Sequence, residues 1–319
     1  MITYKVTKVV KFIAVLGLIV SVSSCTAIKR NVAMKQAANF FEKVERNPVT
    51  RTPEEVGLAF TPITITTEDS VKLSAWFIPS PNSKKLVVFN HFLIGNKAGA
   101  IPHKDWGNVS VNFMPVYKHL VDGGYNILSY DLRNHGASDM YKDGHIDLTM
   151  IEYKDAIAAM KYAENNYPTF SKYVYSQCYG TVSTMRAIKN DPETFKNVKA
   201  YINIQPLSAD AFVNGISKKF NIEGENNLTI FSKQLKKKTG YTVDQLSVQD
   251  IANSIKIPTL LVQVKDDWRT TNVDIENIFN KLGTADKKLL WIESETERLE
   301  GYNYFGKQPE EMLNWLNKY

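Results

Sequence analysis

The feature that most constrains the fold is a series of short apolar runs that alternate along the chain with segments of helical periodicity. The runs cover residues 86–89, 125–130, 173–175, 200–204, 259–264 and 289–292. Short, continuous apolar runs are typical of strands buried on both faces of a parallel sheet. Before the last run, Ile275, Ile278 and Leu282 follow the spacing of an amphipathic helix. The alternation predicts a three-layer α/β fold, with helices on both faces of a mostly parallel sheet.

The N-terminus has the pattern of an export signal. Three lysines and no acidic residue precede an apolar stretch from Phe12 to Val22, which is too short to span a bilayer. Two serines then lead to Cys25, and this segment resembles the lipobox of bacterial lipoproteins. The resemblance implies that residues 1–24 are a signal peptide and that Cys25 carries lipid such as palmitate. The alternative is an ordinary signal peptide with an incidental cysteine.

Lipidation would place the protein in the bacterial cell envelope, anchored to a membrane. Residue 26 is not aspartate, which by resemblance to the bacterial sorting pattern favours the outer membrane in a Gram-negative cell. Because only two cysteines are present, a lipid on Cys25 would leave Cys178 without a disulfide partner. A lone thiol in an exported protein suggests a chemical role.

The segments on either side of Thr61 differ in pattern. The first shows apolar side chains at helical spacing, followed by Pro48 and Pro53. From Thr61 onward the pattern changes to an antiparallel strand pair and then to the alternating series. We therefore expect residues 25–60 to hold a tether and an N-terminal helix, and residues 61–319 to form one domain.

A small helical cap is expected within that domain, at residues 206–256. This stretch is too long for a single crossover and contains helical patterns of its own. Its apolar residues Phe212, Val213, Ile216 and Phe220 suggest a pocket for an apolar acyl group. Such a stripe more often reflects simple packing inside the cap.

Charge and motif content exclude several classes of function. The formal net charge is +6, but without residues 1–24 the chain has 36 basic against 33 acidic side chains, which is too even for a nucleic-acid-binding surface. The basic run from Lys233 to Lys238 is interpreted as a solvated helix face rather than an anionic docking site. Metal-binding spacings and Gly-rich phosphate loops are absent, so we expect no metal and no cofactor.

The strongest chemical signal is the sequence Y-S-Q-C-Y-G from Tyr175 to Gly180, placed after a strand and before a helix. A nucleophile on a tight strand-to-helix turn needs small residues two positions before and after it, and Ser176 and Gly180 meet that need. The segment resembles the nucleophile elbow of α/β-hydrolases, with Cys178 in the place of serine. Cysteine elbows of this kind occur in families such as the dienelactone hydrolases. The alternative is a cysteine that acts as a small buried hydrophobe.

Other landmarks of the α/β-hydrolase family follow in the family's order. Residues 130–138 resemble the D-x-R-G-H-G-x-S segment, with Asn134 in place of a glycine, and the resemblance implies a structural role for His135. Residues 89–93 resemble the oxyanion turn, where Phe92 replaces the usual glycine.

The acid of the family follows a later strand. Here that strand ends at Asp266 and Asp267, and the offset favours Asp267, with Asp266 as the alternative. The resemblance covers residues 61–319 and implies a three-layer α/β-hydrolase fold with a helical cap.

The resemblance also implies a mechanism. Cys178 would attack an acyl carbon, and the N-terminus of the following helix would favour its thiolate form. The backbone N–H groups of Leu93 and Tyr179 would hold the oxyanion, and Asp267 would orient a base.

The expected base is missing. The family places its histidine after the acid, but the five histidines here, at positions 91, 103, 119, 135 and 145, all precede Cys178. Glu300 is nearest to the usual histidine position. Three explanations stay open: the thiol acts alone or with Glu300, His103 or His145 reaches the site, or catalysis has been lost.

Two functions follow from these alternatives. The first is an enzyme, which we favour: a hydrolase or acyltransferase that uses Cys178 on esters or thioesters of a small-molecule substrate. The second is a pseudo-hydrolase that binds a ligand or partner at the membrane. The elbow favours the first function and the missing histidine favours the second.

Overall fold

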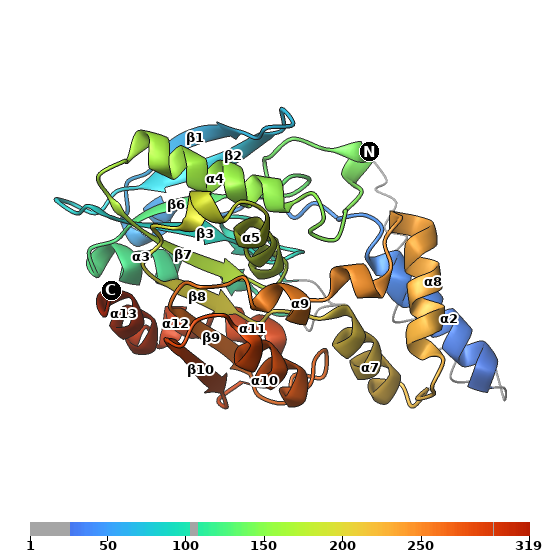
Figure 1. Ribbon diagram of the computed structural model, residues 1–319. Coiled ribbons are helices and arrows are strands. Elements are labelled where there is room, and N and C mark those ends of the chain that lie inside the picture. Colours follow the sequence, from blue (N-terminus) through green and yellow to red (C-terminus); the bar gives the residue numbers. More distant parts are fainter. Residues whose placement is uncertain (1–25, 103–107, 296) are drawn as a thin grey trace.

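The computed structural model describes residues 26–102, 108–295 and 297–319. The expected signal peptide (residues 1–24), the expected lipidation site Cys25 and one of the candidate bases, His103, lie outside the described residues. Within the described part, an eight-stranded sheet runs through the middle of the molecule and is covered by helices on both faces (Figure 1).

The sheet is mixed but mostly parallel, as the alternating apolar runs predict. Its strand order is β1-β2-β6-β3-β7-β8-β9-β10, and β2 runs antiparallel to both of its neighbours, whereas all the other pairs are parallel. Each of the six apolar runs forms one strand of the parallel part. The strands are β1 (Thr61–Thr66), β2 (Lys72–Ile78), β3 (Lys85–Asn90), β6 (Asn126–Tyr130), β7 (Ser171–Gln177), β8 (Tyr201–Ile204), β9 (Thr259–Val264) and β10 (Lys287–Ile292), and a separate pair is formed by β4 (Gly99–Ala100) and β5 (Val111–Asn112).

Helices connect the parallel strands and complete the outer layers. Short helical turns precede β1 and follow β6, and several short helices follow β10. The helices are α2 (Thr26–Phe40), η1 (Pro53–Val56), α3 (Met114–Asp122), η3 (Lys142–Gly144), α4 (Tyr153–Asn166), α5 (Tyr179–Asn190), α6 (Pro192–Phe195), α7 (Ala209–Lys219), α8 (Asn227–Thr239), η4 (Val243–Leu246), α9 (Gln249–Ala252), α10 (Asn272–Lys281), α11 (Arg298–Tyr302), α12 (Tyr304–Lys307) and α13 (Glu310–Asn317).

The sheet separates two hydrophobic cores. On β3, Leu86 and Val88 pack into one core together with α4, α5 and α10, whereas Val87 and Phe89 pack into the other with α3 and α13. Successive side chains of a strand point to opposite faces, so a fully apolar strand feeds both cores. This explains why the buried strands lack alternating polarity.

The cap contains α7 and α8, as expected, and also the N-terminal helix α2. Figure 1 shows α2 and α8 side by side at the edge of the molecule, and the two helices are in contact. Just after α2, the ring of Phe41 makes edge-on contacts with Phe212 of α7 at 5.2 Å and with Phe231 of α8 at 6.1 Å between centroids. Met34 and Ala37 of α2 are fully buried. The segment expected to hold a tether therefore forms part of the cap from Thr26 onward.

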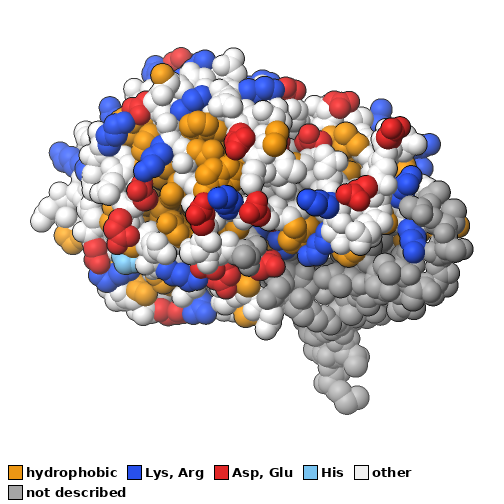
Figure 2. Space-filling view, turned by 90° about the horizontal axis from the view of Figure 1, so that it is seen from below, with side chains coloured by type: hydrophobic (Ala, Val, Ile, Leu, Met, Phe, Trp, Pro, Cys, Tyr) orange, Lys and Arg blue, Asp and Glu red, His pale blue; other side chains and the backbone are white. Residues whose placement is uncertain are grey.

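Across residues 26–102, 108–295 and 297–319, no helix has the length and apolar character required to cross a membrane. Figure 2 shows basic and acidic side chains interspersed over the coloured part of one face. On that part of the face, no large patch of either sign is visible.

Candidate functional site

Cys178 lies at a sharp turn between β7 and α5. Its backbone has φ 50° and ψ −108°, a region that residues with a β-carbon rarely adopt. The turn is held on both sides: the Cys178 N–H donates to the carbonyl of Ile204 at 2.8 Å, and the Cys178 carbonyl accepts from the N–H of Val182 at 3.0 Å. Strain of this kind costs on the order of 1–3 kcal/mol and is characteristic of functional sites. The half-buried thiol lines a pocket.

Gly180 makes this turn possible because α5 begins directly against the end of β3. A β-carbon at Gly180 would overlap the carbonyl oxygen of His91 and would lie 2.7 Å from Asn90 Oδ1. The Gly180 N–H also donates to the His91 carbonyl at 3.1 Å. Replacement of Gly180 by alanine should therefore destabilise the protein by about 2–3 kcal/mol, measured as the change in unfolding free energy in urea.

Gly240→Ala is a suitable control for that measurement. Gly240 ends α8 with φ +83°, and nothing lies within 4 Å of an added β-carbon. Only backbone strain is introduced there, so the loss should be about 1 kcal/mol. A loss at Gly180 no greater than that at Gly240 would contradict the close approach of α5 to β3.

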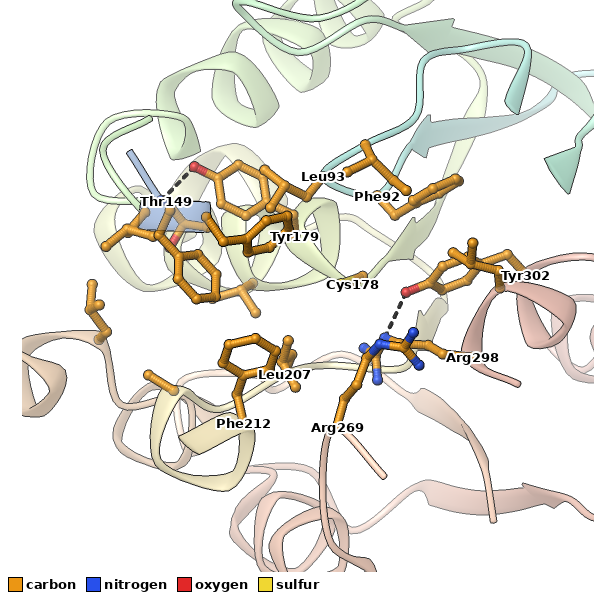
Figure 3. Close-up of a pocket in the computed structure, with 18 residues that line it drawn as sticks. Phe92, Leu93, Thr149, Cys178, Tyr179, Leu207, Phe212, Arg269, Arg298 and Tyr302 are labelled. Atoms are coloured by element: carbon orange, nitrogen blue, oxygen red, sulfur yellow. Dashed lines mark hydrogen bonds between the residues drawn. The ribbon is translucent and has the colours of Figure 1, made fainter. Parts of the chain in front are cut away.

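The pocket beside Cys178 has a volume of about 110 Å³ and is almost entirely apolar. It lies between the carboxyl ends of the central strands and the cap, and Figure 3 shows the side chains that surround it. Phe40 and Phe41 reach it from the end of the N-terminal helix, which the sequence did not predict. The lining consists of Phe40, Phe41, Phe92, Leu93, Ile94, Leu148, Thr149, Cys178, Tyr179, Val182, Leu207, Ala209, Phe212, Leu246, Arg269, Arg298, Leu299 and Tyr302.

The expected oxyanion donors, Leu93 and Tyr179, both line this pocket. Within the described part of the chain, neither backbone N–H donates a hydrogen bond to another protein group. The Leu93 carbonyl accepts from His135 Nε2, which fixes the turn that carries it. Phenylalanine can replace the usual glycine at position 92 because the backbone φ there is not positive. Its ring stacks on Tyr302 with a centroid distance of 4.5 Å.

The histidines that the structure describes do not supply a base to Cys178. His91 and His135 are buried: His91 bonds to the Phe92 carbonyl and the Leu132 N–H, and His135 donates to the Leu93 carbonyl. Burial lowers the pKa of both histidines below the ordinary value. The structural role expected for His135 agrees with these bonds. His119 Nε2 bonds to the Gly306 carbonyl, and His145 does not line the pocket.

Three other side chains form a buried chain that leads from the sulfur. The Tyr302 hydroxyl lies beside Cys178 in the pocket and accepts a hydrogen bond from Arg298 Nε at 2.8 Å. Arg298 Nη1 donates to Asp267 Oδ2 at 2.6 Å, and Arg298 Nη2 donates to the Gln205 carbonyl. Figure 3 shows the Tyr302 hydroxyl directed toward Arg298 beside Cys178. The arrangement links thiol, phenol, guanidinium and carboxylate in order.

The charge states of this chain follow from its burial. Burial raises the pKa of Tyr302 well above its ordinary value, although the neighbouring Arg298 charge opposes the shift. Tyr302 is therefore a neutral donor near pH 7. Burial alone would lower the pKa of Arg298, but Tyr302, Cys178 and Asp267 raise it well above its ordinary value. Arg298 therefore keeps its positive charge, between the phenol and the carboxylate.

The expectation for Glu300 requires a correction of position. The Glu300 carboxylate pairs with Lys307 Nζ at 3.1 Å and does not line the pocket. Arg298 and Tyr302 take the place after β10 where the family resemblance puts a histidine. The two lie on one face of α11 because they are four residues apart, whereas Glu300 is about 200° around the helix from Arg298. The four-residue spacing of Arg298 and Tyr302 is the sequence feature that could have indicated these two residues.

The remaining expectations concern the acid, the cap stripe and metals. Asp267 is buried and reaches the site through Arg298, whereas the alternative, Asp266, is exposed and bonds to Asn272. Of the cap stripe, Phe212 lines the pocket, and the other members pack within the protein. Over the described residues, no group of three or more His, Cys, Asp or Glu side chains could hold a metal ion.

Comparison with known proteins gives structural matches alone. No family of known sequences matches the chain, and no curated protein does. The esterase Pf2001 of Pyrococcus furiosus superposes with a TM-score of 0.65 at 22% identity, over 87% of this chain and 97% of that one.

Two further solved structures are also similar. The α/β hydrolase GrgF of Penicillium sp. sh18 matches with a TM-score of 0.58 at 16% identity, over 82% of this chain and 99% of that one. A dienelactone hydrolase of Anabaena variabilis matches with a TM-score of 0.53 at 15% identity, over 82% and 98%. The protein therefore has the three-layer α/β-hydrolase fold, which confirms the fold class expected from the sequence.

Proposed function

We propose that the protein is a hydrolase or acyltransferase that acts on esters or thioesters through Cys178. The observation that carries this proposal is the strained turn that holds the Cys178 thiol at an apolar pocket, beside the buried Tyr302 hydroxyl. A thiol that only filled space would not require a positive φ. The fold is one on which solved esterases are built, and this similarity supports the proposal without specifying a substrate.

In the first half of the reaction, the Cys178 thiolate attacks the acyl carbon and the carbonyl electron pair moves to the oxygen. The N–H groups of Tyr179 and Leu93 hold that oxyanion, and each such donor is typically worth about 3 kcal/mol. The bond to the leaving group then breaks, and the leaving group takes the Tyr302 proton. The charge of Arg298, 2.8 Å away, stabilises the phenolate that remains.

In the second half, water or another acceptor attacks the thioester carbon and gives a proton to the Tyr302 phenolate. The carbon–sulfur bond breaks, which restores the Cys178 thiolate and releases the acyl product. Tyr302 thus acts first as an acid and then as a base, the two functions that a histidine usually combines. Arg298 and Asp267 act through Tyr302 and are positioning residues.

The direct test is to trap the acyl-enzyme. The full chain is mixed with p-nitrophenyl butyrate or an acyl thioester, quenched in acid and digested, and the peptide that contains Cys178 is weighed by mass spectrometry. We expect a butyryl mass increase on that peptide and release of p-nitrophenol. A peptide that stays unmodified, in a protein that does not hydrolyse these substrates, would refute the proposal.

A second function is supported by one specific observation. No described histidine reaches an apolar pocket that can still hold a ligand, which favours a binding module of the same fold. If the protein is such a binding module, short fatty acids should bind to it and raise its melting temperature. In the trapping experiment, Cys178 should then gain no acyl group. The trapping experiment therefore separates the two functions.

We also propose that the domain works at a bacterial membrane, anchored by lipid on Cys25. The support comes from the sequence pattern of residues 1–25. The first described helix, α2 (Thr26–Phe40), packs in the cap. A lipid on the preceding residue would leave no long tether, so the cap would lie close to the bilayer. Substrates that partition into membranes would then be near the pocket.

Lipidation gives a separate prediction. In bacteria that express the full chain and are fed alkyne-labelled palmitate, the protein should incorporate label and sediment with membranes. Cys25→Ala should abolish the labelling, whereas Cys178→Ala should leave it unchanged, because only the first cysteine lies in the lipobox-like segment. Equal labelling of the Cys25→Ala variant would contradict lipidation at that residue.

A further inference from the structure

The pocket contains one buried guanidinium group whose hydrogen-bond donors are not paired with the described residues. Arg269 lines the pocket and is only 7% exposed. Among the described residues, its guanidinium donates no hydrogen bond, and its Nη1 is buried without a partner. A buried cation that lacks hydrogen-bond acceptors is costly, because it has lost its water shell without replacement. Arg298, by contrast, donates to Tyr302, Asp267 and Gln205.

The two carboxylates nearest to Arg269 do not accept hydrogen bonds from its guanidinium group. Its Nη1 lies 3.6 Å from Asp267 Oδ1 and 3.7 Å from Glu297 Oε2, both too far for a hydrogen bond. Asp267 is already bonded to Arg298, and the Glu297 side chain is about half exposed to solvent. A third cation, Lys219, lies over the Trp268 ring at 3.9 Å, on which Arg269 also stacks at 4.3 Å. Arg269, Arg298 and the exposed Lys219 therefore share two carboxylates, and neither carboxylate accepts a hydrogen bond from the Arg269 guanidinium.

The segment that carries Arg269 is held in place. Helix α7 packs so closely on it that a β-carbon at Gly215 would overlap the carbonyl oxygen of Trp268. The Arg269 N–H donates to Asp267 Oδ1 at 3.1 Å. Figure 3 shows the Arg269 and Arg298 guanidinium groups on the same side of the pocket. Arg269 is therefore a preformed cation at the edge of an apolar cavity.

We propose that Arg269 binds a carboxylate of the substrate, so that the protein acts on esters or thioesters that combine an apolar body with one carboxylate. The inference rests on the proposed function for the reacting bond and names the substrate class. A guanidinium presents parallel N–H groups that match the two oxygens of a carboxylate. A buried guanidinium with an unpaired donor suits a monoanion, and the rest of the lining suits a hydrocarbon chain.

The test uses two alkylating agents of nearly equal size, iodoacetate and neutral iodoacetamide. The full chain reacts with each, and modification of the Cys178 peptide is followed by mass spectrometry. We expect Arg269→Gln to lower the ratio of the iodoacetate rate to the iodoacetamide rate by about tenfold. Arg269→Lys should keep most of the ratio. Lys218→Gln removes the same charge from an exposed site on α7 and should leave the ratio unchanged.

Protection experiments identify the anion. Hexanoate should slow modification of Cys178 by iodoacetamide at least about tenfold more effectively than hexanamide does, and Arg269→Gln should remove that difference. Better protection by hexyl phosphate would overturn the carboxylate assignment in favour of a phosphate. Equal effects of Arg269→Gln on both alkylating agents would overturn the anion site itself.

These measurements need no turnover, so they can be interpreted even if the protein hydrolyses nothing. Because the Arg269 guanidinium donates no hydrogen bond to the described residues, Arg269→Gln should keep a melting temperature close to that of the wild type. If hydrolysis is found, half-esters of dicarboxylic acids should be preferred over neutral esters of equal chain length. Arg269→Gln should reduce that preference mainly through KM, because the carboxylate is bound in both ground state and transition state.

Discussion

Replacement of Cys178 by alanine is expected to lower kcat/KM for p-nitrophenyl butyrate by at least about 1000-fold and to abolish the acyl adduct. The sulfur is the only nucleophile of the described pocket that lies on a strained turn beside two free backbone donors. Without it, no covalent intermediate can form. The measurement is steady-state hydrolysis, combined with mass spectrometry of the quenched protein.

Cys178→Ser sharpens this test. A serine hydroxyl needs a general base to become a nucleophile, and the described histidines lie elsewhere in the protein. We therefore expect the serine variant to be nearly as inactive as the alanine variant, unlike the serine enzymes that share this fold. Both variants should keep the melting temperature of the wild type within a few degrees. Full hydrolysis by Cys178→Ala would assign the activity to another site or a contaminant.

Replacement of Tyr302 by phenylalanine is expected to lower kcat by about 100-fold, the usual contribution of a positioned acid and base. Phenylalanine preserves the ring that stacks on Phe92 but removes the hydroxyl between Arg298 and Cys178. The leaving group then loses its proton donor, and the attacking water loses its acceptor. The rate of alkylation of Cys178 should also fall, because the thiolate loses a hydrogen bond.

Two further measurements separate a proton-transfer role from a structural one. Burial raises the pKa of Tyr302 well above 10, so the hydroxyl stays protonated in the free enzyme, and kcat/KM should show no decline caused by Tyr302 below about pH 10. A thioester with an acidic leaving thiol should be less sensitive to Tyr302→Phe than an alkyl ester, because its leaving group needs no proton. Equal losses for the two substrates would indicate that Tyr302 only shapes the pocket.

Tyr117→Phe is the matched control for this variant. Tyr117 is also fully buried, and its hydroxyl bonds to the Lys97 carbonyl and to Ser129, away from the pocket. Its loss should reduce stability by about 1 kcal/mol and should leave kcat of the folded protein unchanged. A comparable loss of kcat in both variants would mean that general destabilisation accounts for the effect at Tyr302.

The architecture was largely predictable from local sequence patterns. Buried parallel strands must be continuously apolar, and the helices between them must be apolar on one face. Both patterns involve residues that are close together in the sequence, so they can be identified without the structure. Every apolar run became a strand of the central sheet. The contribution of α2 to the cap was not predictable, because its contacts with α7 and α8 join segments about 190 residues apart.

The candidate site was predictable only in part. Cys178 could be recognised because its turn depends on neighbours close in sequence, such as Gly180. The partner of Asp267 could not, because the family resemblance implies a histidine after β10 and the structure has Arg298 and Tyr302 there. Linear distance alone favours a carboxylate, Glu300. Helical geometry turns it away from the pocket and toward Lys307.

The sequence by itself determined the order of strands and helices, the strained turn at Cys178 and the lipobox-like segment, because each depends on residues that are neighbours in the chain. Only the tertiary structure decided which groups surround the sulfur. Arg298 and Tyr302 come from helix α11 after β10, Arg269 comes from the loop after β9 and Cys178 follows β7, and these segments converge only when the parallel sheet has formed. Whether the hydrogen-bond donors of a charged side chain are paired within the protein or remain available to a ligand depends on distances between residues that are far apart in the sequence.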